Sequence, residues 1–180
     1  MIRAFVAIAM PEDVVNRLRL LQFLLPLPRR VEPEDFHLTL AFLGEQPDHR
    51  LEAVHDGLER LAFPPFALEL RGLGLFGGAK PRLAFAAVPD LPDLIRLQAK
   101  IARIAVAAGI AVPSRDFHPH VTLGRFAPPP PDQAIRLERG VAAEQGFHAG
   151  PWAVAEIGLY ASYPQSHGPK YDLIASYPLA

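Results

Sequence analysis

The chain has 180 residues, half of them hydrophobic, and a formal net charge of -1 at pH 7. This length and composition are typical of one compact domain with a sizeable buried core. The balanced charge excludes strong overall attraction of a long nucleic-acid backbone, so we expect any RNA partner to be recognised at one end. The chain has no cysteine, which excludes disulfides, thiolate catalysis and cysteine-ligated metal.

The chain shows no targeting or membrane-spanning segment. Its first residues lack the longer apolar region and cleavage pattern of a signal peptide, and Pro11 interrupts them early. No run of about 18 apolar residues is long enough to cross a bilayer. We therefore expect a cytoplasmic monomer with no membrane contact and no protein partner.

The first half of the chain opens with a predicted strand and helix. Residues 2–9 form an apolar run typical of a strand. Val14, Leu18 and Leu21 then recur at helical spacing and predict a helix that ends near Pro26.

Alternating side chains predict a strand over residues 36–43. His37, Thr39 and Ala41 then share one face, because alternate residues of a strand point the same way. The opposite face carries apolar side chains and is expected to face the core: Leu38, Leu40 and Phe42.

The order of elements then begins again. A helix starting at Asp48 and a strand over residues 66–75 complete the first half. The later predicted elements are a strand over 82–88, a helix over 91–108, a strand over 118–125, a helix over 132–144, and strands over 152–162 and 170–177. His37 lies 35 positions after Ile2 and His120 lies 38 after Arg82, so each histidine occupies a similar place in its half.

This repetition predicts an α+β fold of duplicated, two-lobed design, with antiparallel sheets and outer helices around a central cleft. Residues 1–180 would form one domain whose pseudo-symmetric halves span about 1–76 and 82–180. An approximate two-fold axis would place the two histidine strands across that cleft.

The main chemical signal is a His-x-Thr-Leu motif that occurs twice. His37 and Thr39 belong to the first copy and His120 and Thr122 to the second, and the histidines are 120 − 37 = 83 positions apart. A strand presents each histidine and threonine on one face while the leucine stays buried. Either motif alone is more often an ordinary half-exposed strand, but two copies in matching positions favour a site.

Two histidines can supply both proton transfers that the opening of a cyclic phosphate requires. Their ordinary pKa lies near neutrality, so one can act as base and the other as acid. Thr39 and Thr122 would donate hydrogen bonds to the phosphate oxygens. We expect neither a cofactor nor a metal. The rival interpretation is a metal site formed by His118, His120, His37 and Asp116.

The two motifs and their surroundings resemble the 2H phosphoesterase superfamily, in particular its RNA 2′,3′-cyclic phosphodiesterases, also called 2′-5′ RNA ligases. The resemblance rests on HLTLAFLG at 37–44 and FHPHVTLGR at 117–125, with RAFVAI at 3–8, PRLAF at 81–85, GLY at 158–160 and GPKY at 168–171. It covers almost the whole chain. Ala41 and Ala84 depart from it, since the family often has lysine and tryptophan at or near these positions.

The resemblance implies an enzyme that hydrolyses an RNA-terminal 2′,3′-cyclic phosphate to a 2′-phosphate, with weak 2′-5′ ligation. His37 would be the proton donor and His120 the proton acceptor. Two alternatives stay open: a phosphodiesterase for small cyclic nucleotides or ADP-ribose cyclic phosphate, and a non-catalytic module that binds RNA ends or nucleotides.

Other residues are weaker candidates for substrate binding. Strict alternation places Arg125 on the face opposite His120, which favours a structural or rim role unless a bulge turns it inward. Tyr160 and Phe5 could stack on a nucleobase, although core packing is the commoner role of such rings. His118 shares a face with His120 and could support it.

Overall fold

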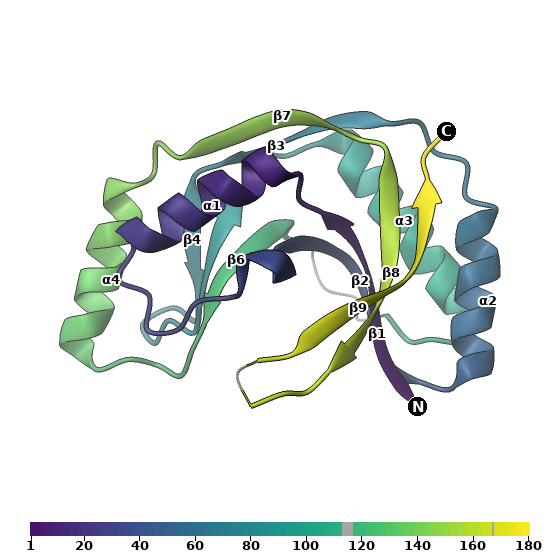
Figure 1. Cartoon of the computed structure of the whole chain (residues 1–180), viewed down its shortest axis with the longest axis horizontal. Helices are drawn as coiled ribbons and strands as arrows, with labels where there is room; N and C mark the ends of the chain where they lie inside the picture. The colour runs from purple at the N-terminus through teal and green to yellow at the C-terminus, as the bar shows by residue number, and fades with distance from the viewer. Residues whose placement is uncertain (113–116, 167) are drawn as a thin grey trace.

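A computed structural model of the chain describes residues 1–112, 117–166 and 168–180 (Figure 1). The first half contains β1 (Ile2–Ala9), α1 (Glu12–Leu24), the short 3₁₀ helix η1 (Pro33–Asp35), β2 (His37–Gln46), α2 (Asp48–Glu59), β3 (Phe66–Arg71) and β4 (Leu73–Phe76). The second half contains β5 (Leu83–Ala87), α3 (Pro92–Ala107), β6 (His120–Arg125), α4 (Pro131–Ala143), β7 (His148–Val154), β8 (Glu156–Tyr163) and β9 (Lys170–Pro178).

Local sequence accounts for the first helix. Pro11 precedes α1, where a missing backbone N–H costs nothing, and the acidic residues of its first turn suit the positive end of the helix dipole. Val14, Leu18 and Leu21 are buried at the predicted spacing. The helix ends before Pro26, as predicted.

A seven-stranded antiparallel sheet forms the centre of the molecule, in the order β4-β5-β6-β2-β1-β8-β9. A two-stranded sheet of β3 and β7 accompanies it. In Figure 1, α1 and α4 lie toward one side of the molecule and α2 and α3 toward the other, and β3 and β7 run across the top. The predicted α+β class is confirmed, but the two histidine strands, β2 and β6, are neighbours in one sheet.

The strand order is symmetric about the contact between β6 and β2. On either side the strands follow as β6-β5-β4 and β2-β1-β8, so β4 of the first half pairs with β5 of the second, and β8 of the second half pairs with β1 of the first. The last strand, β9, extends the sheet beyond β8. This exchange corrects two predictions: residues 66–75 divide into β3 and β4, and residues 152–162 divide between β7 and β8. The apolar pattern continues through both breaks, while the two parts of each segment join different sheets.

Bulges interrupt β2 and β6 directly after their threonines. Ala7 pairs with Thr39 and Val6 with Ala41, so Leu40 is an extra residue in β2. Such a bulge reverses the alternation beyond it. The prediction that Phe42 faces the core is therefore wrong: its side chain is 43% exposed, whereas Ala41 is 3% exposed.

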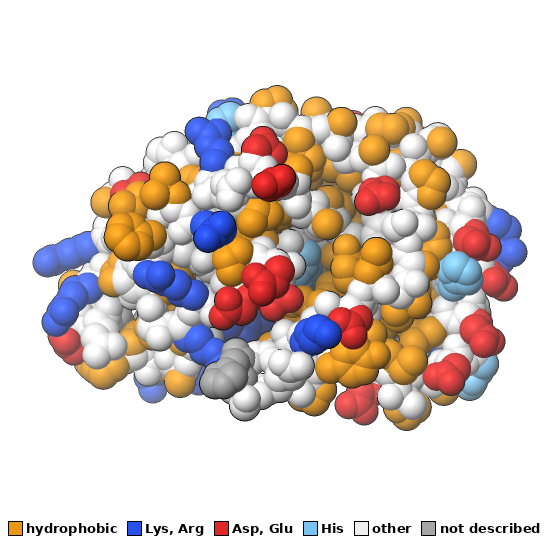
Figure 2. All heavy atoms as spheres, viewed as in Figure 1, with side chains coloured by type: hydrophobic (Ala, Val, Ile, Leu, Met, Phe, Trp, Pro, Cys, Tyr) orange, Lys and Arg blue, Asp and Glu red, His pale blue; other side chains and the backbone are white. Residues whose placement is uncertain are grey.

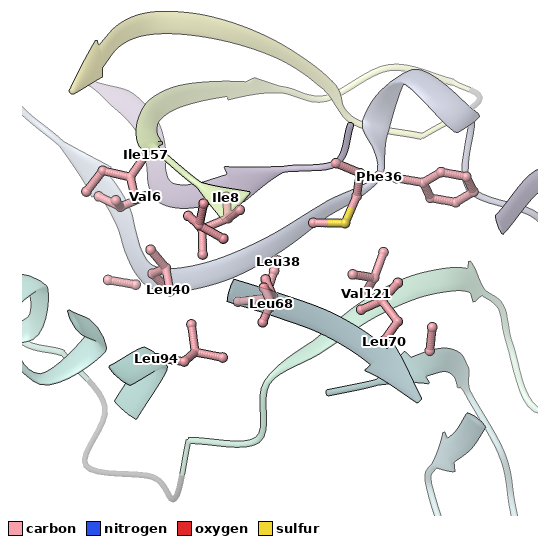
Figure 3. Close-up of a cluster of buried hydrophobic side chains, with 14 of the residues drawn as sticks. Val6, Ile8, Phe36, Leu38, Leu40, Leu68, Leu70, Leu94, Val121 and Ile157 are labelled. Carbon is pink, nitrogen blue, oxygen red and sulfur yellow. The ribbon is translucent and has the colours of Figure 1, made fainter. Parts of the chain in front are cut away.

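The core lies behind the two histidine strands. Leu38 and Val121 are Cα partners across β2 and β6, and both are fully buried. Leu68 and Leu70 of β3 lie in the same cluster, as does Leu94 of α3 in the view of Figure 3. The site strands are thus fixed by close packing, which positions the side chains on their other face. In the part of the chain that the structure describes, no helix is long and apolar enough to cross a membrane.

Candidate active site

The two motifs meet at the point where β2 and β6 pair. Because the strands are antiparallel and Leu38 lies opposite Val121, His37 lies opposite Thr122 and Thr39 lies opposite His120. All four are half-buried, on the face opposite the core. Side chains at directly opposite positions have Cβ atoms about 4.5–5.5 Å apart, and diagonal neighbours about 7–8 Å apart. Two imidazoles and two hydroxyls therefore lie next to one another on one face of the sheet.

Both histidines are held through the same ring nitrogen. Nδ1 of His37 donates to the carbonyl of Asp35 over 2.7 Å, and Nδ1 of His120 donates to the carbonyl of His118 over 2.7 Å. A carbonyl can only accept, so each Nδ1 carries the proton in the neutral ring. Nε2 is then free to take or give a proton on the opposite side of each ring.

Aromatic rings surround His37. Phe5 lies 4.8 Å from it and Tyr171 lies 5.0 Å away at 87°, both measured between ring centroids. Tyr160 stacks on Phe5 at 5.3 Å. Phe5 itself is only 4% exposed, so it supports the histidine from within the protein. Tyr160 and Tyr171 are half-buried and keep part of their surface accessible.

A second set of aromatic rings surrounds His120. Phe76 and Phe85 lie 5.1 Å and 5.4 Å from it, between ring centroids, and they stack on each other at 4.3 Å. Gly74 makes this arrangement possible, since a Cβ at that position would collide with the Phe85 ring. Phe5 and Phe85 both lie on a strand next to a histidine strand, but at different registers: Phe85 pairs with Thr122, whereas Phe5 pairs with Phe42.

The surroundings lower the pKa of both histidines. Burial of the ring lowers the pKa of His37 most, the charges of His120 and Arg125 lower it further, and the bond to Asp35 opposes these effects. Burial also lowers the pKa of His120, with contributions from the charges of Arg125 and His118, against the bond to the His118 carbonyl. Neutral imidazole is thereby favoured in the free protein, which makes a base available near neutral pH.

The bulge in β6 brings Arg125 to the site. Phe85 pairs with Thr122 and Ala84 with Gly124, so Leu123 is the extra residue. The alternation reverses there, and the prediction that Arg125 lies on the opposite face is wrong. Its charge lowers the pKa of His37, of His120 and of Tyr171. Ala41 and Ala84 are instead buried on the core side of the sheet, at 3% and 1% exposure.

Acidic side chains line one edge of the site. Glu32 and Glu34 are exposed and flank the half-buried Asp35, whose pKa is raised by burial first and then by these two charges. In Figure 2, acidic side chains gather over η1, beside a histidine recessed near the centre of this face. The edge of the site therefore combines the positive charge of Arg125 with the negative charges of η1.

The described residues contain no group of three or more histidine, cysteine, aspartate or glutamate side chains placed to hold a metal ion. Of the proposed metal ligands, His37 and His120 come together, whereas the His118 side chain is exposed and Asp116 lies outside the described residues. His118 instead contributes its carbonyl to His120. The described residues of the site thus provide a pair of histidines with two hydroxyls.

Known proteins are similar to this chain. The sequence model of the 2′-5′ RNA ligase superfamily matches residues 7–163, which include both motifs. The chain belongs to this superfamily. The resemblance inferred from the motifs is confirmed.

Relatives of this superfamily member are named RNA 2′,3′-cyclic phosphodiesterase. The one from Geobacillus stearothermophilus is 33% identical over 86% of this chain, but the chain spans only about half of that protein, 49%. The one from Escherichia coli is 31% identical over 89% of this chain and 86% of its own. The crystal structure of E. coli LigT complexed with 3′-AMP superposes with a TM-score of 0.80, at 26% identity and 99% and 98% coverage.

Sequence reasoning missed several residues around the superfamily's paired motifs. Phe85 could have been found, since it lies in the PRLAF segment at 81–85 that already carries part of the resemblance. Phe76 and Tyr171 come from strands whose pairing no local pattern reveals, and Asp35 acts through its backbone carbonyl, which leaves no signature in the side chain.

Proposed function

We propose that this protein hydrolyses the 2′,3′-cyclic phosphate at an RNA end to a 2′-phosphate by metal-independent acid-base catalysis. One observation supports this most: two histidines lie beside two hydroxyls on one face of the sheet, and each has Nδ1 fixed by a carbonyl and no hydrogen bond from Nε2 to any described residue. The names of the relatives support the reaction and the substrate.

The reaction needs one base and one acid. Water attacks phosphorus in line with the 3′ oxygen and loses a proton to the neutral histidine. The bond between phosphorus and the 3′ oxygen breaks, and the protonated histidine gives its proton to that oxygen, leaving a 2′-phosphate. Thr39 and Thr122 donate to the non-bridging oxygens, and Arg125 adds positive charge where negative charge builds. A 5′-hydroxyl that attacks in place of water, with the same departure of the 3′ oxygen, would form a 2′-5′ bond.

We propose His37 as the donor and His120 as the acceptor, following the family. In the free protein, burial and the charge of His120 disfavour a proton on His37. The anionic phosphate offsets this, because a negative charge between the rings raises the pKa of both. The two rings exchange one proton as a pair, so their apparent pKa values belong to the pair rather than to either residue.

A small cyclic nucleotide is a second candidate substrate. The acidic residues Glu32, Glu34 and Asp35 beside the site repel a long phosphate backbone but not a single nucleotide. Solved complexes of E. coli LigT with 3′-AMP and with ATP indicate that nucleotides bind to that protein.

Product analysis tests the proposal directly. An RNA oligonucleotide and a mononucleotide, both with a 2′,3′-cyclic phosphate, would be incubated with the protein in the presence of EDTA. We expect a 2′-phosphate product, formed faster from the oligonucleotide, and no product with the His37→Ala, His120→Ala double variant. A 3′-phosphate product, or activity that EDTA abolishes and one divalent ion restores, would contradict the mechanism. Faster turnover of the mononucleotide would select the second candidate.

A further inference from the structure

A buried glutamine connects strand β6, which carries His120 and Arg125, to the segment of chain that leads to His37. Gln22 on α1 is 4% exposed, although glutamine is usually found at the surface. Its side-chain amide donates to the carbonyl of Leu123 over 2.7 Å and to the carbonyl of Val31 over 2.8 Å. A buried amide of this kind is costly unless it is hydrogen-bonded, so its contacts fix its place.

The first of these contacts reaches the bulge that turns Arg125 toward the site. Leu123 is the extra residue of β6, and β6 pairs with β2 only at Val121. The Leu123 carbonyl therefore has no strand partner on the β2 side. It is satisfied by Gln22 and by the backbone N–H of Val31, over 3.0 Å. The bulge that orients Arg125 is thus held by α1.

The second contact leads to His37. Val31 stands just before η1, and Asp35 at the end of η1 accepts the bond from His37. Segment 29–31 also packs closely on β6, since a Cβ on Gly124 would collide with the Arg29 carbonyl. One amide therefore joins the strand of His120 and Arg125 to the segment that leads to His37.

We propose that Gln22 is a positioning residue for the reaction: it fixes the β6 bulge against segment 29–31 so that both histidines and Arg125 reach one phosphate. This inference rests on the proposed function for its kinetic readout only. In α3 of the second half, Ala102 stands 80 residues later, and alanine has no side-chain amide that could form such a bridge.

Gln22→Met tests this, since methionine keeps the length and the apolar stem and removes the amide. We expect kcat/KM for a cyclic-phosphate oligonucleotide to fall on the order of 10-fold to 10²-fold, because small misplacements of reacting groups are costly. We expect the fall to be mainly in kcat, and the pH profile to move to higher pH as Arg125 moves away from the histidines.

Gln145→Met is the matched control. Gln145 also donates its amide to two backbone carbonyls, Leu73 over 2.9 Å and Val141 over 3.2 Å, but at the outer strand β4. We expect this variant to lower the melting temperature and leave the pH profile in place. If Gln22→Met behaves in the same way, Gln22 is merely structural and the proposal is wrong.

NMR titration of His37 and His120 in the free protein separates this proposal from the proposed function. Gln22→Met should raise both pKa values and Gln145→Met should raise neither, whether or not the protein hydrolyses the substrate. In an Arg125→Ala background the substitution of Gln22 should add little to either shift. Should Gln22→Met not fold, Gln22→Asn, whose shorter side chain cannot bridge both carbonyls, takes its place. Unchanged pKa values in a folded variant overturn the proposal.

Discussion

The two histidine environments are built alike at their centre and differently at their rim. Each histidine is held by the carbonyl two residues before it, and each strand bulges after its threonine. Beyond the bulges, the matching positions carry Phe42 on β2 and Arg125 on β6. The guanidinium of Arg3 lies over the Phe42 ring, at 4.8 Å from its centroid.

The groups suited to proton transfer are thus present in both halves, whereas the charged groups suited to substrate binding differ between them. The duplicated parts are those that a symmetric pair of proton transfers needs, namely two oriented imidazoles and two hydroxyls. The charged groups differ between the two sides: the charge of Arg125 on β6 acts on both histidines, whereas the acidic residues of η1 lie beside His37. Under the proposed function, this asymmetric field would give the RNA end a preferred orientation in a nearly symmetric site.

The largest expected loss of activity comes from replacing either histidine of the pair. His37→Ala and His120→Ala should each lower kcat by on the order of 10²-fold to 10⁴-fold, since each removes one proton transfer. Steady-state kinetics with a cyclic-phosphate oligonucleotide measures this. The control is His55→Ala, a histidine bonded to Tyr177 away from the paired motifs, which should keep the wild-type rate. A wild-type rate in either single variant would contradict the paired-histidine mechanism.

Removing either threonine hydroxyl should lower activity less than removing a histidine, and by about the same factor for each threonine. Thr39→Val and Thr122→Val keep the shape of each side chain and remove one donor to a charged oxygen, worth about 1.5–3 kcal/mol. We expect kcat/KM to fall by about 10-fold to 10²-fold for each variant. A large difference between them would show that the duplicated centres are not equivalent.

The substitution with the smallest expected effect on rate, that of Arg125, tests the difference in charge between the two sides most clearly. Arg125→Met should raise KM about 5-fold to 10-fold, as expected for an exposed cation. Its positive charge lowers the pKa of both histidines, so its removal should raise both pKa values and move the bell-shaped profile of kcat/KM to higher pH. Phe42→Met, at the matching position, should leave that profile unchanged. Equal shifts in the two variants would contradict the assignment of the field to Arg125.

The sequence predicts the centre of this site well because the centre is local. A strand places residues i and i+2 on one face whatever its partners are, so His37 with Thr39 and His120 with Thr122 follow from the motifs alone. Proline and apolar spacing likewise predict the helices within a few residues.

The residues at the edge of the site could not be predicted, because bulges and strand exchange depend on strands that are far apart in the sequence. Alternation places Phe42 in the core and Arg125 away from the site, and one extra residue in each strand reverses both. Residues 66–75 read as one strand, although their two parts pair with β7 and β5. No pattern within the segment specifies that choice.

The most direct test of the central claim compares leaving groups in the two histidine variants. If His37 supplies the proton to the departing oxygen, a substrate with an already good leaving group needs little protonation. Such a substrate should restore much of the rate of His37→Ala and little of the rate of His120→Ala, measured as kcat/KM against the natural ribose oxygen. Equal restoration in both variants, or preferential restoration of His120→Ala, would contradict the assignment of donor and acceptor.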